Sequence, residues 1–202
     1  MPRIELFFDC GSPWTYLAFH GIEPIAAEAG AELVYRPILV GGIFNTINES
    51  VYASREKPVP QKWAYHRKDL ADWARFRGLE IGWPKVFPVN SVHAMRGCLV
   101  AGEHDTAALP VFARRVFEAY WRDLEDISQR PVLEAIVRDV GIDSAEFFER
   151  LDAPEIKSAL RENTQEVMDR GGFGSPTLFL NGDDMYFGQD RLELLRAALL
   201  ES

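Results

Sequence analysis

The spacing of apolar positions along the chain changes twice, and each change marks a different kind of structure. Near the N-terminus the apolar residues form short continuous runs, Ile4–Phe8 and residues 32–38, which predict two buried strands. Between them lies a helical pattern from Ser12 to Ala29, where serine is a preferred N-cap and the proline after it suits the first helical position. A glycine follows at its end, and Pro24 either kinks this helix or splits it in two. Strand, helix and strand in this order predict a parallel βαβ unit with a right-handed crossover.

The middle of the chain has a different pattern of apolar and polar positions. Residues 41–60 are rich in Gly, Asn, Ser and Pro, and we expect them to be irregular. From there to residue 170 the apolar positions repeat with a period near 3.6, which predicts helices almost throughout. The expected helices lie at 62–77, 91–103, 106–122, 131–140, 144–151 and 154–170.

At the C-terminus the pattern returns to short strands. Thr177–Leu180 and Met185–Phe187 flank the tight-turn pair Asn-Gly, and a last helix is expected at 192–200. The resulting order β-α-β…β-β-α is that of a thioredoxin-like fold. We therefore predict an α/β protein with a thioredoxin-like domain formed by residues 1–42 and 172–202. An all-helical insertion domain of residues 43–171 interrupts it.

Composition narrows the function classes. The 202 residues carry 22 Lys and Arg against 31 Asp and Glu, a net charge of −9, which argues against nucleic acid as the main partner. No apolar run approaches the roughly 20 residues of a membrane span, and no signal peptide is visible, so we expect no membrane partner and a cytoplasmic location. The two cysteines, Cys10 and Cys98, are far apart and form no C-x-x-C pair, so neither a disulfide framework nor a metal site is expected.

Three short motifs are specific in combination. The first is Phe8-Asp9-Cys10-Gly11-Ser12-Pro13-Trp14-Thr15-Tyr16-Leu17-Ala18. The second is Gly172-Phe173-Gly174-Ser175-Pro176-Thr177, followed by Phe187-Gly188-Gln189-Asp190-Arg191-Leu192, and the third is Phe87-Pro88-Val89-Asn90-Ser91. With the element order, they resemble the 2-hydroxychromene-2-carboxylate isomerases and the related kappa-class glutathione transferases. These enzymes belong to the superfamily of the periplasmic thiol–disulfide oxidases, whose thioredoxin domain carries a helical insertion.

Ser12 is the predicted catalytic residue. In thioredoxin-like oxidoreductases a cysteine stands at this helix start, where free N–H groups and the helix dipole stabilise a thiolate. Here Ser12-Pro13-Trp14-Thr15 replaces Cys-x-x-Cys, and a serine and a threonine cannot cycle as a disulfide. What is left is an anion site without its own thiol, whose simplest use is to hold the thiolate of glutathione, the expected cofactor. The alternative is that Ser12 only caps the helix.

The resemblance implies further glutathione ligands. Pro176 is expected to be cis and to face the active helix, so that Ser175 pairs with the cysteinyl unit as in β-strand addition. Gln189 and the helix amides would hold the γ-glutamyl carboxylate, and Asp190 its ammonium, while Arg191 is a ligand or a structural residue. Otherwise Asp190 would simply cap the helix.

The segment that leads into the insertion supplies less specific candidates. Lys62 is expected to bind a carboxylate of glutathione or of the substrate, and Asn48 to contact the substrate, with Lys57 and Asn45 as competitors. The alternative for Lys62 is a solvated side chain. Asn90 either lines the cleft between the two domains or caps the helix that begins at the next residue.

The remaining reactive side chains are expected to be structural. The histidines have no ligand spacing and no partnered acid, so neither zinc binding nor catalysis is predicted for them. Cys98 is expected in the core, and Cys10 is expected to pack at the strand end, the alternative being a reactive thiol that faces the ligand. The aromatic residues Trp63, Trp73, Trp83, Trp121, Phe112 and Phe117 are expected mainly in the core, with a few lining an apolar slot for a flat substrate.

The combined prediction is a homodimeric, glutathione-dependent isomerase that converts 2-hydroxychromene-2-carboxylate, a small aromatic carboxylate, to trans-o-hydroxybenzylidenepyruvate. The thiolate held at Ser12 would be a borrowed nucleophile. The first alternative is a glutathione transferase that conjugates electrophiles at the same site. A thiol–disulfide oxidoreductase and a non-catalytic module that binds glutathione are the others.

Overall fold

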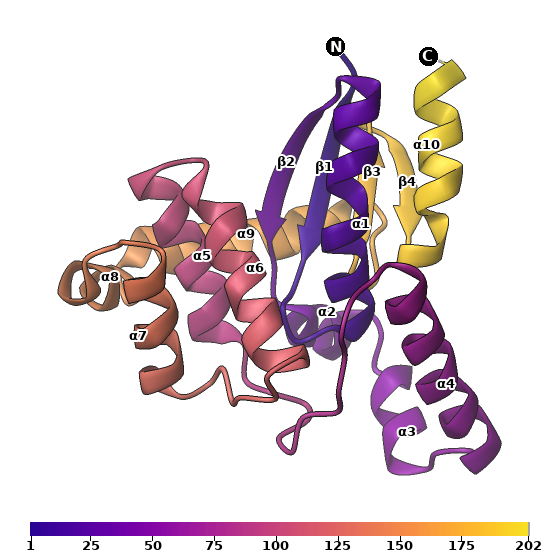
Figure 1. Ribbon diagram of the computed structural model, residues 1–202, viewed down its shortest axis with the longest axis horizontal. Helices are drawn as coiled ribbons and strands as arrows, with labels where there is room; N and C mark the ends of the chain where they lie inside the picture. Colours follow the sequence, from indigo (N-terminus) through magenta and orange to yellow (C-terminus); the bar gives the residue numbers. More distant parts are fainter. Residues whose placement is uncertain (202) are drawn as a thin grey trace.

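A four-stranded mixed sheet forms the centre of the protein (Figure 1). The computed structural model describes residues 1–201, apart from the side chains of residues 54, 55 and 201. The strands are β1 (Arg3–Phe8), β2 (Glu32–Pro37), β3 (Thr177–Leu180) and β4 (Asp184–Phe187), in the order β2-β1-β3-β4. β1 and β2 are parallel, and the other two pairings are antiparallel. The predicted βαβ and ββα ends are thus confirmed as parts of one sheet.

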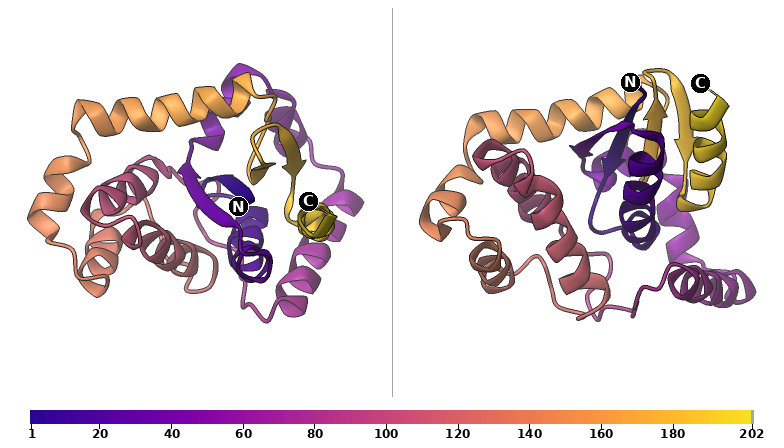
Figure 2. Two further views of the ribbon diagram at one scale, coloured as in Figure 1. Left: turned by 90° about the horizontal axis from the view of Figure 1, so that it is seen from above. Right: turned by 45° about the horizontal axis from the view of Figure 1, so that its top comes forward.

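Alternation along β1 divides the core between the two faces of the sheet. Ile4, Leu6 and Phe8 are fully buried in the main core with α1 (Pro13–Ala29) and α10 (Leu192–Glu201). Phe7 points to the other face, where it meets Phe179 and α9 (Pro154–Asp169). Figure 2 shows α9 passing over that face.

Helix α1 is continuous, which excludes the predicted split at Pro24. A proline inside a helix removes one backbone hydrogen bond, and burial of the residues around it compensates for this loss: Ile22, Ile25 and Ala26 are all buried. The helix ends as predicted at Gly30, which adopts the left-handed conformation.

The expectation of irregular structure at residues 41–60 is wrong, because two helices form there. These are α2 (Val40–Thr46) and α3 (Ser50–Glu56). Tertiary contacts override the glycine-rich local sequence: Ile43 is fully buried on the second face of the sheet, and the amide of Val40 donates to the Asp9 carboxylate at 2.9 Å.

The other helices lie close to their predicted positions. They are α4 (Pro60–Phe76), α5 (Val92–His104), α6 (Ala108–Trp121), α7 (Arg130–Asp139) and α8 (Ser144–Arg150), and a short 3-10 turn, η1 (Gln189–Arg191), precedes α10. α5 packs against α6, α8 and α9, to the left of the sheet in Figure 1, whereas α3 and α4 lie at its lower right, where α3 contacts α2 and α4 contacts α1. The division into two domains at residues 42 and 172 stays a prediction. In the part of the chain that the structure describes, no helix has the length and apolar character needed to cross a bilayer.

Candidate active site

A pocket of about 710 Å³ opens at the start of α1, where the predicted catalytic serine lies. Its walls come from the first turn of α1, the α2–α3 segment, α4, the loop before α5, and the segments before β3 and at the end of β4. The lining residues are Gly11, Ser12, Pro13, Trp14, Val40, Phe44, Asn48, Val51, Pro58, Trp63, His66, Arg67, Leu70, Trp83, Phe87, Pro88, Phe173, Gly174, Ser175 and Phe187. Its volume is in the range of small-molecule sites.

Ser12 is the N-cap of α1. Its amide donates to the carbonyl of Asp9 at 3.1 Å, which closes the turn after β1. Its hydroxyl oxygen accepts the Thr15 amide at 3.3 Å, and the hydroxyl proton is donated to the Ser175 carbonyl at 3.1 Å. The side chain is therefore held at the positive end of the helix, on the wall of the pocket.

The segment before β3 faces this helix start. The Ser175–Pro176 peptide bond is cis, as predicted. The buried Ser175 hydroxyl accepts the amide of Asp9 at 2.9 Å and shares a hydrogen bond of 2.8 Å with the Thr15 hydroxyl. Thr15, which stands in the place of the second cysteine of Cys-x-x-Cys, is thus part of a hydroxyl network with Ser175.

Aromatic rings form much of the pocket wall. Trp83 packs edge-on against Trp63 with ring centroids 5.1 Å apart and contacts Phe87 at 4.9 Å, while Phe173 and Phe187 pair at 4.3 Å. Trp63 and Phe173 are each 41% exposed and Phe187 is 37% exposed. Exposed aromatic side chains gathered around one cavity indicate a surface that binds a ligand rather than core. Of the aromatic residues considered in the sequence, Trp63 and Trp83 line the pocket, whereas Trp121, Phe112 and Phe117 are buried in the core. A slot for a flat substrate stays a prediction.

Asp9 is a buried acid beneath the site, and the sequence prediction gave it no role. One carboxylate oxygen accepts the Gly11 amide at 2.8 Å, and the other accepts the Val40 amide at 2.9 Å and the Ser91 hydroxyl at 3.1 Å. Burial raises the pKa of Asp9, although these hydrogen bonds oppose the shift. The side chain joins the turn before Ser12 to the starts of α2 and α5.

The predicted γ-glutamyl ligands lie outside the pocket lining. Gln189 is only 2% exposed, and its side-chain oxygen accepts two hydrogen bonds from the guanidinium of Arg77, at 3.1 and 3.3 Å. Asp190 and Arg191 form an exposed ion pair of 2.8 Å with each other. Their roles toward glutathione stay predictions.

Of the weaker candidates, Asn48 lines the pocket. Its amide nitrogen donates to the Phe173 carbonyl at 3.1 Å, which links the α2–α3 segment to the segment before β3. Lys62 is exposed and outside the lining. Asn90 is also exposed, and its side-chain oxygen accepts the Val92 amide at 3.1 Å, the contact expected of the helix-start alternative.

Two lining residues on α4, His66 and Arg67, were not predicted as site residues. The helical spacing of α4 contained the signal, because positions 63, 66, 67 and 70 share one helix face and all four residues line the pocket. Without the fold, nothing showed that this face points toward Ser12 rather than toward solvent.

Cys10 is confirmed as a packing residue. Its side chain is fully buried, its amide donates to the Met95 sulfur at 3.3 Å, and its thiol lies 4.0 Å from the Ala113 carbonyl. Burial raises the pKa of the Cys10 thiol well above its usual value, which suppresses the thiolate. The alternative of a reactive thiol facing the ligand is not supported.

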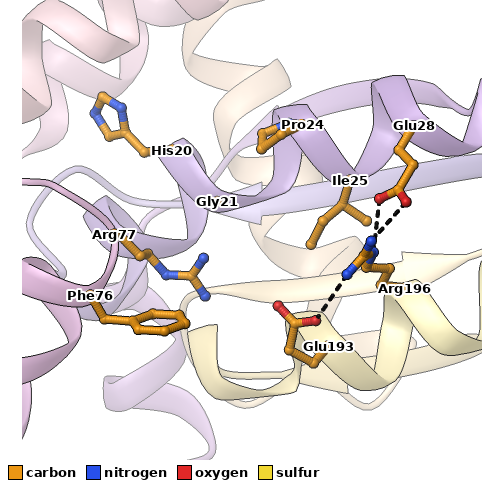
Figure 3. Close-up of a pocket in the computed structure, with 9 residues that line it drawn as sticks. All are labelled: His20, Gly21, Pro24, Ile25, Glu28, Phe76, Arg77, Glu193 and Arg196. Carbon is orange, nitrogen blue, oxygen red and sulfur yellow. Dashed lines mark hydrogen bonds and ion pairs between the residues drawn. The ribbon is translucent and has the colours of Figure 1, made fainter.

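A second pocket of about 300 Å³ lies between α1, the end of α4 and α10 (Figure 3). Its charged side chains are engaged: Arg196 pairs with Glu28 at 2.7 Å and Glu193 at 3.7 Å, and Arg77 donates to Gln189. We interpret this pocket as part of the joint between the three helices.

Comparison with known proteins agrees with this geometry. The DSBA-like thioredoxin domain family matches residues 3–200. The chain is 30% identical over 200 residues to the 2-hydroxychromene-2-carboxylate isomerase of Pseudomonas putida, covering 97% of this chain and 93% of that protein. It is 28% identical to human glutathione S-transferase kappa 1, covering 100% of this chain and 92% of the human protein.

Solved structures give the same result. A 2-hydroxychromene-2-carboxylate isomerase superposes with a TM-score of 0.83 at 25% identity, covering 98% of this chain and 95% of the other. The chain therefore belongs to the DSBA-like thioredoxin family and, within it, to the 2-hydroxychromene-2-carboxylate isomerase family with its kappa-class glutathione transferase relatives.

Proposed function

We propose that this protein is a glutathione-dependent isomerase that converts 2-hydroxychromene-2-carboxylate to trans-o-hydroxybenzylidenepyruvate. The observation that carries the proposal is the Ser12 hydroxyl, held at the N-terminus of α1 opposite the cis Ser175–Pro176 bond in an aromatic pocket. This place in the fold suits a thiolate, and the chain supplies no thiol for it, since both cysteines, Cys10 and Cys98, are buried in the core.

The residues around Ser12 fit the cysteinyl part of glutathione. The amide end of α1 and the Ser12 hydroxyl provide donors for a thiolate, and the backbone of Ser175 offers groups for an extended peptide. When bound, glutathione would supply a sulfur nucleophile that adds to the conjugated substrate and leaves after rotation about the resulting single bond.

When glutathione binds, Ser12 and Ser175 would exchange their mutual hydrogen bond for hydrogen bonds to the ligand. The Ser12 proton now donated to the Ser175 carbonyl would turn to the sulfur, and the freed carbonyl would accept an N–H of the ligand. The Thr15 amide continues to hold the Ser12 oxygen, so the hydroxyl turns about a fixed position. A charged hydrogen bond of this kind contributes roughly 1.5–3 kcal/mol, which lowers a thiol pKa by about one to two units.

The aromatic wall would bind the other reactant. Five aromatic rings of the lining offer apolar faces for a flat ring system: Trp63, Trp83, Phe87, Phe173 and Phe187. Exclusion of water by these rings would strengthen the electrostatic interactions around the sulfur.

Conjugation of electrophiles by a glutathione transferase is the second candidate, favoured by the 28% identity to human glutathione S-transferase kappa 1. It needs the same thiolate site but no return of the thiol. Disulfide exchange is disfavoured, because Thr15 stands where the second active-site thiol would be and its hydroxyl is bonded to Ser175.

One set of assays separates these functions. The protein is mixed with glutathione and, in turn, the chromene carboxylate, 1-chloro-2,4-dinitrobenzene and an oxidised dithiol. We expect turnover of the chromene carboxylate that requires glutathione without consuming it. Stoichiometric consumption of glutathione with the chlorobenzene alone would indicate the transferase, and turnover of the dithiol would contradict both.

A further inference from the structure

One face of α4 forms a wall of the pocket. Trp63, His66, Arg67 and Leu70 occupy positions i, i+3, i+4 and i+7 of the helix and all line the cavity. Arg67 therefore lies on the same face as two apolar side chains, one helical turn from the tryptophan that packs on Trp83.

The pocket lining carries basic side chains and no acidic ones among the described residues. These basic side chains are Arg67 and His66. The neighbouring cation on the helix differs, because Lys68 forms an ion pair with Asp72 and lies outside the lining. No such pair to Arg67 is present among the described residues. The pocket thus combines aromatic walls with an uncompensated guanidinium.

We propose that Arg67 is the specificity-determining residue that selects aromatic substrates carrying a carboxylate, through an ion pair with that carboxylate on the α4 wall. This inference rests on the proposed function and adds to it the residue that recognises the substrate. Guanidinium is suited to this task because its planar fork matches a carboxylate with two parallel hydrogen bonds, whereas an ammonium acts as a point charge. His66, on the same face, adds a polar neighbour.

Lys62 is the competing cation, since the sequence prediction assigned it to a carboxylate. It lies one residue before Trp63, is exposed, and does not line the pocket. The structure therefore favours Arg67 over Lys62 as the partner of the substrate carboxylate.

The kinetic test compares R67M with K68M, a matched loss of the adjacent charge. We expect R67M to raise the KM for the chromene carboxylate about 10- to 100-fold, the range of a lost charged hydrogen bond, with a much smaller change in kcat. Conjugation of the neutral 1-chloro-2,4-dinitrobenzene and the affinity for glutathione should change less than about 2-fold. K68M should leave all of these values unchanged, and R67K should recover part of the loss.

A binding test keeps the inference separate from the proposed reaction. Quenching of tryptophan fluorescence reports binding of trans-2-hydroxycinnamate and of its neutral methyl ester without glutathione or turnover, because Trp14, Trp63 and Trp83 line the pocket. The wild type should prefer the acid by about 10-fold, and R67M should lose this preference. Lack of chromene isomerisation by the wild type would refute the proposed function and leave this preference measurable.

Two results would overturn the inference. Retention of the acid preference in R67M, with its loss in K62M, would give the role to Lys62. A fall in glutathione affinity in R67M with the acid preference intact would place a carboxylate of glutathione on Arg67 instead.

Discussion

The middle and the C-terminal end of α4 use cationic side chains in opposite ways. At the middle of the helix, Arg67 is exposed and lines the pocket on the same helix face as Trp63. Just after its C-terminus, Arg77 is half-buried between α1 and η1, where its guanidinium donates to the side-chain oxygen and the carbonyl of Gln189. A Cβ at Gly21 would clash with the guanidinium of Arg77 and with Leu192, so glycine at this position of α1 leaves room for both side chains.

This difference shows how one helix can contribute both to the fold and to the candidate active site. Arg77, whose guanidinium is paired, joins the end of α4 to η1. Arg67, which forms no ion pair among the described residues, lies on the face of α4 that lines the pocket. Polar groups that are paired and buried contribute to the fold, whereas charges left unpaired beside exposed aromatic rings are the ones available for binding. The contrast can be tested at Arg67, at Arg77 and at the start of α1.

Ser12→Ala should have the largest effect, on catalysis. We expect turnover to fall about 10²- to 10³-fold, the usual cost of losing a donor to a developing or stored negative charge. Unfolding free energy should fall by only about 1 kcal/mol, the cost of an N-cap. The control is Asp143→Ala, which removes the N-cap of α8, where Asp143 accepts the Glu146 amide at 2.9 Å. A similar loss of activity in the control would show that Ser12→Ala acts by lowering stability.

Arg77→Ala should have the largest effect on the fold. It leaves the side-chain oxygen of Gln189 buried without its donor, at a cost of about 1–3 kcal/mol in unfolding free energy. The matched control is Arg75→Ala, two residues earlier, where an exposed arginine pairs with Asp72 and the expected cost is below about 0.5 kcal/mol. Chemical denaturation measures both. Equal costs would show that the joint at Gln189 contributes no more than a surface ion pair.

Asp9→Asn tests the buried acid through the pH dependence of stability. Burial raises the pKa of Asp9 in the folded state, so its contribution is fully present below the unfolded pKa and is lost as pH rises through the folded value. The wild type should therefore gain stability relative to Asp9→Asn as pH falls. Asp72→Asn should show the opposite slope, because the Lys68 partner lowers the pKa of Asp72. Denaturation at several pH values compares them, and parallel slopes would contradict the assignment.

Asp190→Ala should have the smallest effect. The structure shows Asp190 exposed and paired with Arg191, so we expect glutathione affinity to fall by no more than about 5-fold, roughly 1 kcal/mol. Calorimetry measures this loss. Glu193→Ala, which removes an acidic side chain three residues later in α10, is the charge control. A loss above about 50-fold would show that Asp190 moves into the site when glutathione binds.

The sequence predicted the features that depend on residues close together in the chain. The Ser-Pro start of α1, its glycine end and the four strands follow from capping and periodicity, and the structure confirms them. The cis Ser175–Pro176 bond, which the family resemblance implied, is also confirmed. The split at Pro24 and the irregular segment at 41–60 do not form, because burial in the core outweighs local propensity there.

Long-range pairings account for the site features that the sequence missed. Arg77 meets Gln189 across 112 positions, and Asp9 meets Ser91 across 82, so no local pattern relates them. Arg67 is a different case, because its helix face was visible in the spacing and only the direction of that face required the fold.

The pKa of the glutathione thiol in its complex with this protein tests the central claim most directly. It is obtained by titrating the ultraviolet absorbance of the thiolate in the wild type and in Ser12→Ala. We predict that the wild type lowers the thiol pKa by about one to two units from about 8.5, and that Ser12→Ala returns much of this shift. An unshifted thiol in the wild type, or an equal shift in both proteins, would contradict the assignment of Ser12 as the donor that holds the thiolate.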